Sequence, residues 1–222
     1  IPAILHLTRL GYDYVSISDA TKRGVIDADT NIFTDIFTQS LARINKHIDN
    51  LNPNSTIDEL KNLLDYEDLG KAFYERITNE SGIKIIDFED FNNNSFHVCT
   101  ELTYKNGDDE FRPDITILIN GLPLAFIEVK KPNNKGGIVA ESERMNSRRM
   151  PNKKFRRFLN ETQIMVFSNN MEYDAEGGIT PIQGAFYATV SSDKVILNTF
   201  HEEDTSIFNQ IKPIDAETED FI

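Results

Sequence analysis

The chain has 222 residues, of which 39% are hydrophobic and 27% are charged, so it can bury a core and is not a disordered segment. No apolar run reaches the roughly 18 residues of a membrane span. The single cysteine, Cys99, excludes an internal disulfide framework and predicts a reducing, cytoplasmic location. The formal net charge of −13 argues, taken as a total, against a nucleic-acid partner.

The first eighty residues show mainly helical periodicity. The predicted helices are 2–10, 33–49, 56–66 and 69–79, and the predicted strand between the first two is 12–18. Gly11 is a suitable residue to end the first helix, and Ser55 or Thr56 is suitable as the N-cap of the third. The apolar stripes of these helices most simply form a core.

From about residue 95 the hydrophobic period changes to two, which is typical of strands. The predicted strands are 95–104, 111–119, 122–130, 163–168, 185–190 and 194–197, and the predicted helices are 138–149, 153–162 and 205–211. Lys105-Asn106-Gly107 indicates a hairpin turn. Because strands and helices mix without a regular βαβ repeat, we expect an α+β fold, a mixed sheet flanked by helices.

The positive charge is concentrated in one segment. Between Lys130 and Arg157 there are ten Lys or Arg against Glu141 and Glu143, a charge of +8 that leaves −21 for the rest of the chain. The candidates for contact with nucleic acid are Lys131, Arg144, Arg148, Arg149, Lys153, Lys154, Arg156 and Arg157. Such a segment either follows a phosphate backbone or is a solvated helix face.

Two carboxylates and a lysine interrupt the apolar strands 111–119 and 122–130. The aliphatic residues that alternate with them are Ile115, Ile117, Ile119, Ala125, Ile127 and Val129. In an antiparallel hairpin, pairs whose numbers add to an even value place all six aliphatics on one face, which we expect to be the buried one. The same register brings Asp114, Glu128 and Lys130 together on the other face. A three-residue loop with Gly121 left-handed would give this register.

The cluster of Asp114, Glu128 and Lys130 suits metal-assisted hydrolysis of a phosphodiester. Two converging carboxylates repel unless a cation lies between them, and oxygen ligands favour Mg²⁺ or Mn²⁺, with the carboxylates roughly 4–6 Å apart. Lys130 can reach a phosphate oxygen or an attacking water. Alternatively, Lys130 forms a salt bridge with a carboxylate at a strand end and no chemistry follows.

The same residues resemble a known motif. Pro113-Asp114, followed after thirteen residues by Glu128-Val129-Lys130, is similar to the PD-(D/E)xK nuclease motif, which by itself is degenerate. The longer run Arg112-Pro113-Asp114-Ile115, Asn120 to Leu124 and Ile127 to Lys130 resembles the N-terminal nuclease domain of type I restriction enzyme R subunits. Leu10-Gly11-Tyr12 and Val166 to Asn170 extend the resemblance over most of the chain.

This resemblance implies a restriction-endonuclease-like fold over 1–212, with a helical insertion at 33–80, a catalytic part at 95–200 and an acidic linker at 213–222. It implies that Asp114 and Glu128 hold Mg²⁺ and that Lys130 activates water. The implied partners are double-stranded DNA and the modification and specificity subunits. ATP would act only through a translocase region outside this chain, since no GxxxxGK[ST] motif occurs in it.

One departure from the family pattern concerns the helix after the second strand. Many R subunits carry QxxxY there, whereas this chain has Glu141 and Met145, and the similarly spaced Gln163 to Phe167 belongs to a later strand. Glu141 is therefore either an accessory carboxylate near the metal or an ordinary exposed helix residue. Other interpretations of the chain are a PD-(D/E)xK nuclease acting on RNA or DNA junctions, or a non-catalytic DNA-binding or assembly module.

Overall fold

A computed structural model describes residues 2–132, 134, 136–171, 184–190 and 192–200. The helices are α1 (Pro2–Arg9), α2 (Ile17–Arg23), α3 (Thr34–Ile44), α4 (Pro53–Leu64), α5 (Lys71–Ile77), α6 (Gly137–Arg144) and α7 (Arg156–Glu161). Short 3₁₀ turns are η1 (Phe91–Asn93) and η3 (Lys153–Phe155), and η2 (Met145–Arg149) is a π-helix that continues α6.

The strands form one mixed sheet and a separate hairpin. They are β1 (Asp13–Tyr14), β2 (Phe96–Thr100), β3 (Tyr104–Asn106), β4 (Asp109–Phe111), β5 (Ile115–Ile119), β6 (Leu122–Val129), β7 (Ile164–Ser168), β8 (Ala185–Ala188) and β9 (Asn198–Thr199). The seven-stranded sheet has the order β1-β2-β5-β6-β7-β8-β9, and β3 pairs with β4. The pairs β1–β2 and β6–β7 are parallel and the others are antiparallel. The expected mixed sheet flanked by helices is confirmed.

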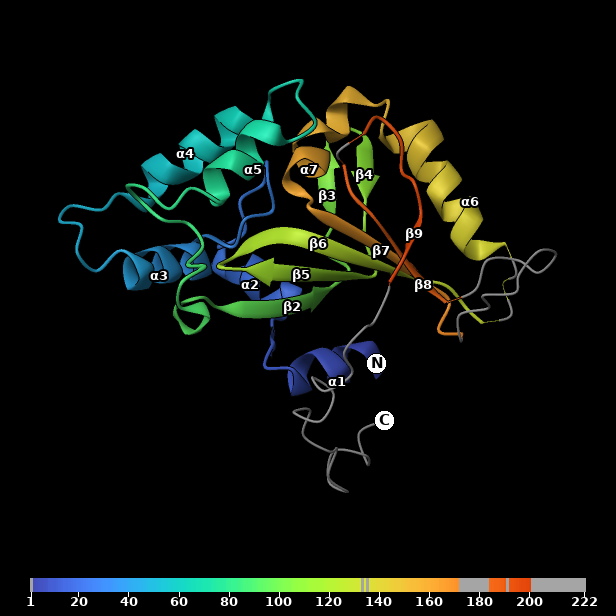
Figure 1. The fold of residues 1–222 in the computed structure, drawn as a ribbon, viewed down its shortest axis with the longest axis horizontal. Coiled ribbons are helices and arrows are strands. Elements are labelled where there is room, and N and C mark those ends of the chain that lie inside the picture. Colours follow the sequence, from blue (N-terminus) through green and yellow to red (C-terminus); the bar gives the residue numbers. More distant parts are fainter. Residues whose placement is uncertain (1, 133, 135, 172–183, 191, 201–222) are drawn as a thin grey trace.

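Helices α4, α5, α6 and α7 form an arc over one side of the sheet, whereas α1 lies on the other side (Figure 1). The core follows this arrangement. Leu122 and Leu124 of β6 pack with α3, α4 and α5, and Phe126 packs with α6, η2 and α7. A smaller cluster around Ala20, Phe33 and Cys99 joins α2 to the sheet.

Several predicted boundaries differ from the structure for local reasons. The strand predicted at 12–18 is shorter, because Ser16 caps α2 by accepting a hydrogen bond from the Asp19 amide. Asn52, not Ser55 or Thr56, is the N-cap of α4, since Pro53 supplies the first helical residue. The last strand lies at Asn198–Thr199 and not at 194–197.

The strands predicted at 95–104 and 111–119 each divide in two. Glu101, at a φ of 57°, ends the first part, and Pro113, which has no amide hydrogen to donate, separates β4 from β5. The predicted hairpin at Lys105-Asn106-Gly107 is confirmed as β3–β4. The predicted helix at 205–211 and the acidic linker at 213–222 lie outside the described residues.

The β5–β6 hairpin reaches the predicted register by a different route from the expected loop. Asn120 and Gly121 have φ values of 52° and 82°, so a two-residue turn joins strands paired as Ile119 with Leu122. A β-bulge between Ile117 and Leu118 then shifts the pairing, and Ile115 pairs with Ile127. The predicted three-residue loop is wrong, whereas the predicted antiparallel pairing with an even sum is confirmed at the end that carries the carboxylates.

The buried face of β6 is the one opposite to the face that was expected to be buried. Leu124, Phe126 and Glu128 are at most 6% exposed, whereas Val129 on the opposite face is 41% exposed. The helical layer covers the face that carries Glu128, so this carboxylate points into the interior. The expectation that all six aliphatic residues form the buried face is wrong: Ile115 is buried, but the other five are half-buried or exposed. The hairpin alone does not determine which face receives the helices.

Candidate functional site

Asp114 lies in a bend directly before β5, where the chain turns toward the end of β6. Its backbone carbonyl accepts a hydrogen bond from the Glu101 amide at 3.2 Å, and its Oδ2 accepts one from the Val129 amide at 2.7 Å. Because Ile115 pairs with Ile127, the next step of the ladder places Asp114 opposite Glu128. The sheet therefore brings these two carboxylates together.

Glu128 is a buried carboxylate near the end of β6. Its side chain is 7% exposed. Among the described residues, the Glu128 carboxylate accepts one hydrogen bond, from Lys130 Nζ to Oε2 at 3.0 Å. Burial raises the pKa of Glu128, the hydrogen bond from Lys130 opposes this, and the negative charges of Glu141 and Asp114 raise it further. Lys130 is thus the one described cation that contacts the Glu128 carboxylate, and the other Glu128 oxygen has no hydrogen-bond donor among the described residues.

Lys130 lies between two carboxylates. Its Nζ is 3.0 Å from Glu128 Oε2 and 3.0 Å from Glu141 Oε2, and its amide donates to the Ser168 carbonyl at the end of β7 at 2.7 Å. Burial acts to lower the pKa of Lys130, but the hydrogen bonds to the two carboxylates outweigh it and the pKa is raised. Lys130 is therefore a charged ammonium and a poor general base in this arrangement.

Glu141, on α6, is not an exposed helix residue. It is 1% exposed, and besides Lys130 it binds Arg144 Nη1 at 2.7 Å and Arg149 Nη1 at 2.6 Å. Burial acts to raise the pKa of Glu141, and the hydrogen bonds from Arg149 and Lys130 outweigh this effect, so the pKa is lowered. Glu141 is thus an ionised anchor for three cations.

Arg149 extends this network to another strand. Its guanidinium carbon lies 3.8 Å from the centroid of the Phe111 ring at the end of β4. Arg149 closes the π-helix η2, which changes the phase of the helix so that a residue eight positions after Glu141 turns back toward it. The sequence did not predict this contact, because in a regular α-helix residue 149 would lie about 12 Å further along the axis than residue 141.

Gln163 does not replace the missing QxxxY residue at this site. Its amide donates to the Leu124 carbonyl at 2.7 Å, which places it at the start of β7, while Glu128 pairs with Phe167 further along the same strand. Its side chain donates to the Glu161 carbonyl at 2.9 Å. Gln163 to Phe167 therefore belongs to a strand, as expected, and its glutamine lies at the far end from the carboxylates.

Asp114 and Glu128 fit a hard divalent cation by their donor type. Mg²⁺ in proteins commonly takes one or two carboxylates and completes its shell with water, and the single hydrogen bond of Glu128 leaves carboxylate lone pairs for such an ion. In the described part of the chain no three His, Cys, Asp or Glu side chains are grouped as a metal centre. Lys130 already supplies one positive charge between Glu128 and Glu141, so a metal ion would share Glu128 with it.

Most of the predicted DNA-contacting cations already have carboxylate partners. Lys153 lies 3.3 Å from Glu67, and Lys154 lies 2.7 Å from Asp109. Arg156 also pairs with Glu67, and Arg157 binds both oxygens of Asp65 at 2.7 and 2.8 Å. Arg144 and Arg149 bind Glu141, whereas Lys131 and Arg148 are exposed. Six of the eight cations thus have a carboxylate partner in the structure, and Lys131 and Arg148 are exposed.

Comparison with known families decides the relationship of the chain. Residues 1–174 match the family described as type I restriction enzyme R protein N terminus. The chain belongs to this family.

Proteins with similar sequences occur in Methanocaldococcus jannaschii. The chain is 30% identical over 195 residues to a protein named as a type I restriction enzyme MjaIXP endonuclease subunit, an alignment that covers 77% of this chain and 18% of that protein. It is 36% identical over 88 residues to one named as the MjaVIIIP endonuclease subunit, covering 40% of this chain and 8% of the other. The chain thus spans less than a fifth of the length of the relatives it matches.

No helix among the described residues of this R-protein N-terminal domain has the length and apolar character required to cross a membrane.

Proposed function

We propose that this R-protein N-terminal domain is a Mg²⁺-dependent endonuclease domain that hydrolyses DNA phosphodiester bonds within a type I restriction enzyme. The observation that supports it is the meeting of Asp114, Glu128 and Lys130 at one end of the β5–β6 hairpin, with Glu128 and Lys130 in a partly enclosed, charged cluster. Burying a carboxylate and an ammonium costs free energy unless the two charges pair, and such charged groups are frequent at catalytic sites.

In this proposal each side chain has a distinct role. Asp114 and Glu128 hold Mg²⁺ or Mn²⁺, and a bound ion of this kind would lower the pKa of a coordinated water. Lys130 holds the attacking water and offsets the charge that builds on the phosphate. Lys130 acts as an ammonium, because its pKa is raised by the hydrogen bonds to its two carboxylate partners against the effect of burial.

Glu141 positions Lys130 in the same proposal. A lysine held only by Glu128 would lose its partner whenever that carboxylate binds something else. The contact to Glu141 Oε2 at 3.0 Å keeps the ammonium in place, and Arg144 and Arg149 hold Glu141 in turn. This role differs from an accessory metal ligand, since the carboxylate of Glu141 already serves three cations.

The partners of the proposed enzyme follow from the family. Double-stranded DNA is the substrate, its backbone contacted by the exposed Lys131 and Arg148 and, after exchange of their carboxylate partners, by the cations of residues 153–157. The modification and specificity subunits would supply assembly and sequence recognition, and ATP would be used by a translocase region outside this chain. A cytoplasmic location is consistent with a single cysteine, Cys99, that is buried.

Metal binding and cleavage are tested together. Calorimetric titration with Mn²⁺ should show binding to the parent and to Lys130→Ala, and none to Asp114→Ala or Glu128→Ala. Cleavage of plasmid DNA by the complete restriction enzyme should be lost in all three variants, and Glu101→Gln, which alters an exposed carboxylate beside Asp114, should behave as the parent. Unaltered Mn²⁺ binding in Asp114→Ala and Glu128→Ala would show that the ligands are wrongly assigned.

The competing interpretation, a DNA-binding or assembly module, gives a different pattern. Lys130 is neutralised by two carboxylates in the structure, as a purely structural salt bridge would be. In that case the complete enzyme carrying Lys130→Ala would still cleave DNA, and the parent domain would bind DNA without binding Mn²⁺.

A further inference from the structure

A cavity of about 430 Å³ lies outside the carboxylate cluster, where the β3–β4 hairpin, the segment after α4 and the start of α7 meet. Its lining includes five cations: Lys105, Lys153, Lys154, Arg156 and Arg157. Two carboxylates, Asp29 and Asp65, complete the charged part of the lining. The walls therefore carry a surplus of three positive charges although the chain as a whole is strongly acidic.

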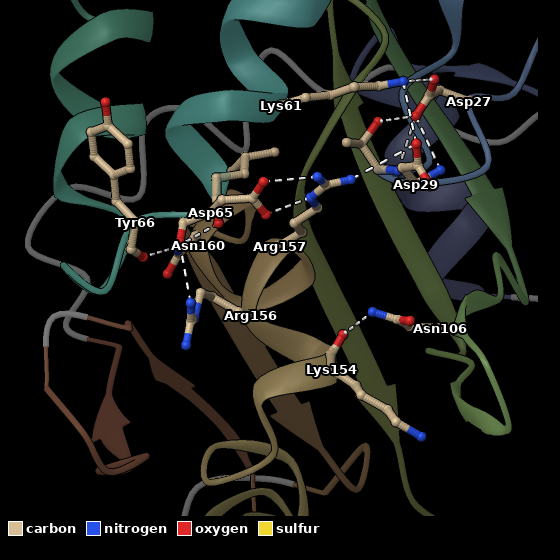
Figure 2. A network of polar contacts seen from close by, with 12 residues as sticks. Asp27, Asp29, Lys61, Asp65, Tyr66, Asn106, Lys154, Arg156, Arg157 and Asn160 are labelled. Atoms are coloured by element: carbon tan, nitrogen blue, oxygen red, sulfur yellow. Dashed lines mark hydrogen bonds and ion pairs between the residues drawn. The ribbon is translucent and has the colours of Figure 1, made fainter.

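The walls of the cavity are fixed by hydrogen bonds (Figure 2). Asn106 Nδ2 donates to the Lys154 carbonyl at 3.0 Å, which joins the hairpin to η3. Asn160 Nδ2 donates to the carbonyls of Leu64 and Tyr66, both at 2.9 Å, which joins α7 to the segment after α4. A ligand would therefore enter a preformed site and would not have to order it.

Two donor groups at the cavity, Lys105 Nζ and Arg157 Nη1, make no hydrogen bond to another described residue. Lys105, exposed on β3, has no ion-pair partner among the described residues. Arg157 uses Nε and Nη2 to bind Asp65, and its Nη1 lies 3.8 Å from Asp29 Oδ2, too far for a hydrogen bond. Figure 2 shows the Arg157 guanidinium between these two aspartates. Lys105 can thus donate to an anion directly, and Arg157 Nη1 can do so by giving up its ion pair with Asp29.

The other lysines and Arg156 form ion pairs with exposed or partly exposed carboxylates, which an anion can replace. Lys154 Nζ lies near the hairpin turn, since a Cβ at Gly107 would be 3.7 Å from it. Its carboxylate partner Asp109 is partly exposed, and Glu67, the partner of Lys153 and Arg156, is 66% exposed. Exposed ion pairs contribute little stability, so an entering anion can replace them.

We propose that this cavity is a phosphate-binding pocket that holds one phosphate group. The class of ligand follows from the lining: it presents lysine and arginine donors, which suit phosphate oxygens, and its aromatic residue, Tyr104, is only 2% exposed and offers no ring face on which a base could stack. Of the five cations that line the cavity, Lys105 is the one that lies outside the basic segment 130–157. The phosphate group comes either from a nucleic-acid strand or from a free anion, and only the first source rests on the proposed function.

The test measures binding of inorganic phosphate to the purified chain by calorimetry, with ionic strength held constant by sodium chloride. Lys105→Ala should weaken phosphate binding about tenfold, as expected for loss of one charge-assisted hydrogen bond. Asp29→Asn should tighten it about threefold, because a partly exposed negative charge leaves the wall. Lys71→Ala, at an exposed lysine on α5 outside the cavity, is the matched control and should bind as the parent.

A second arm identifies the source of the phosphate. A short DNA duplex should compete with inorganic phosphate and should itself bind Lys105→Ala more weakly than Lys71→Ala. If phosphate binds as expected and the duplex does not compete, the pocket stands as a site for a free anion, and the DNA-binding part of the proposed function fails here. If Lys105→Ala and Asp29→Asn bind phosphate like the parent, or the parent binds none, the pocket is overturned. Far-ultraviolet circular dichroism of each variant confirms that it is folded.

Discussion

Glu161 gives the sharpest prediction about stability. This residue ends α7, is 1% exposed, and neither of its carboxylate oxygens has a hydrogen-bond partner among the described residues. Burial raises its pKa well above the ordinary value of 4.5, and the negative charge of Asp27 adds to the effect. Glu161 is therefore protonated in the folded chain at pH values where it is ionised in the unfolded chain.

The sign of the pH dependence follows from this difference. Below pH 4.5 Glu161 is protonated in both states and contributes no pH dependence. Above it, only the unfolded chain releases the proton, so the free energy of unfolding falls by about 1.4 kcal/mol per pH unit until the pH passes the folded-state pKa. Glutamine has nearly the same shape and cannot ionise. Glu161→Gln should therefore leave stability nearly unchanged at pH 4.5 and raise it at higher pH, by about 1.4 kcal/mol for each pH unit over which folded Glu161 keeps its proton.

Urea unfolding followed by circular dichroism at half-unit intervals from pH 4.5 to 7 measures this effect. The difference between Glu161→Gln and the parent removes the contribution of all other titrating groups, provided both unfold in one step. Glu143→Gln, an exposed carboxylate on α6, is the control and should give a flat difference. A flat difference for Glu161→Gln as well would mean that Glu161 is ionised in the folded state, and the reasoning from its burial would be refuted.

Three further predictions concern other parts of the molecule. Glu141→Gln should lower kcat for DNA cleavage by the complete enzyme about tenfold or more with little change in KM, because Lys130 loses an ionised anchor, whereas Glu143→Gln should leave kcat unchanged; equal kcat values in both variants would contradict the positioning role. Replacement of the four cations Lys153, Lys154, Arg156 and Arg157 by alanine should weaken DNA binding about equally across sequences and flatten its salt dependence. An unchanged salt dependence in a filter-binding assay would mean that these cations only form ion pairs within the protein. Gly121→Ala should lower the free energy of unfolding by more than about 1 kcal/mol, and a thermal melt should show a lower melting temperature. The reason is that Gly121 has a φ of 82° and that a Cβ there would lie 2.6 Å from the Phe33 carbonyl oxygen.

The sequence predicted the features that depend on local pattern. The period of two around Asp114 and Glu128 determined that their strands form a hairpin, and Asn120-Gly121 marked its turn. The resemblance carried by Arg112 to Ile115 and Ile127 to Lys130 identified the family that residues 1–174 match. These features need only neighbours in sequence, because alternation and turn preference are properties of a few consecutive residues.

The tertiary structure decided which face is buried and which charges meet. The bulge between Ile117 and Leu118 restored the register that a two-residue turn alone would have shifted, and the helical layer then covered the face with Glu128. The partner of Arg157 is Asp65, ninety-two residues away, and the π-helix brings Arg149 to Glu141. No periodicity encodes such contacts, because they arise only when separate elements pack and each buried charge must find an opposite charge within reach.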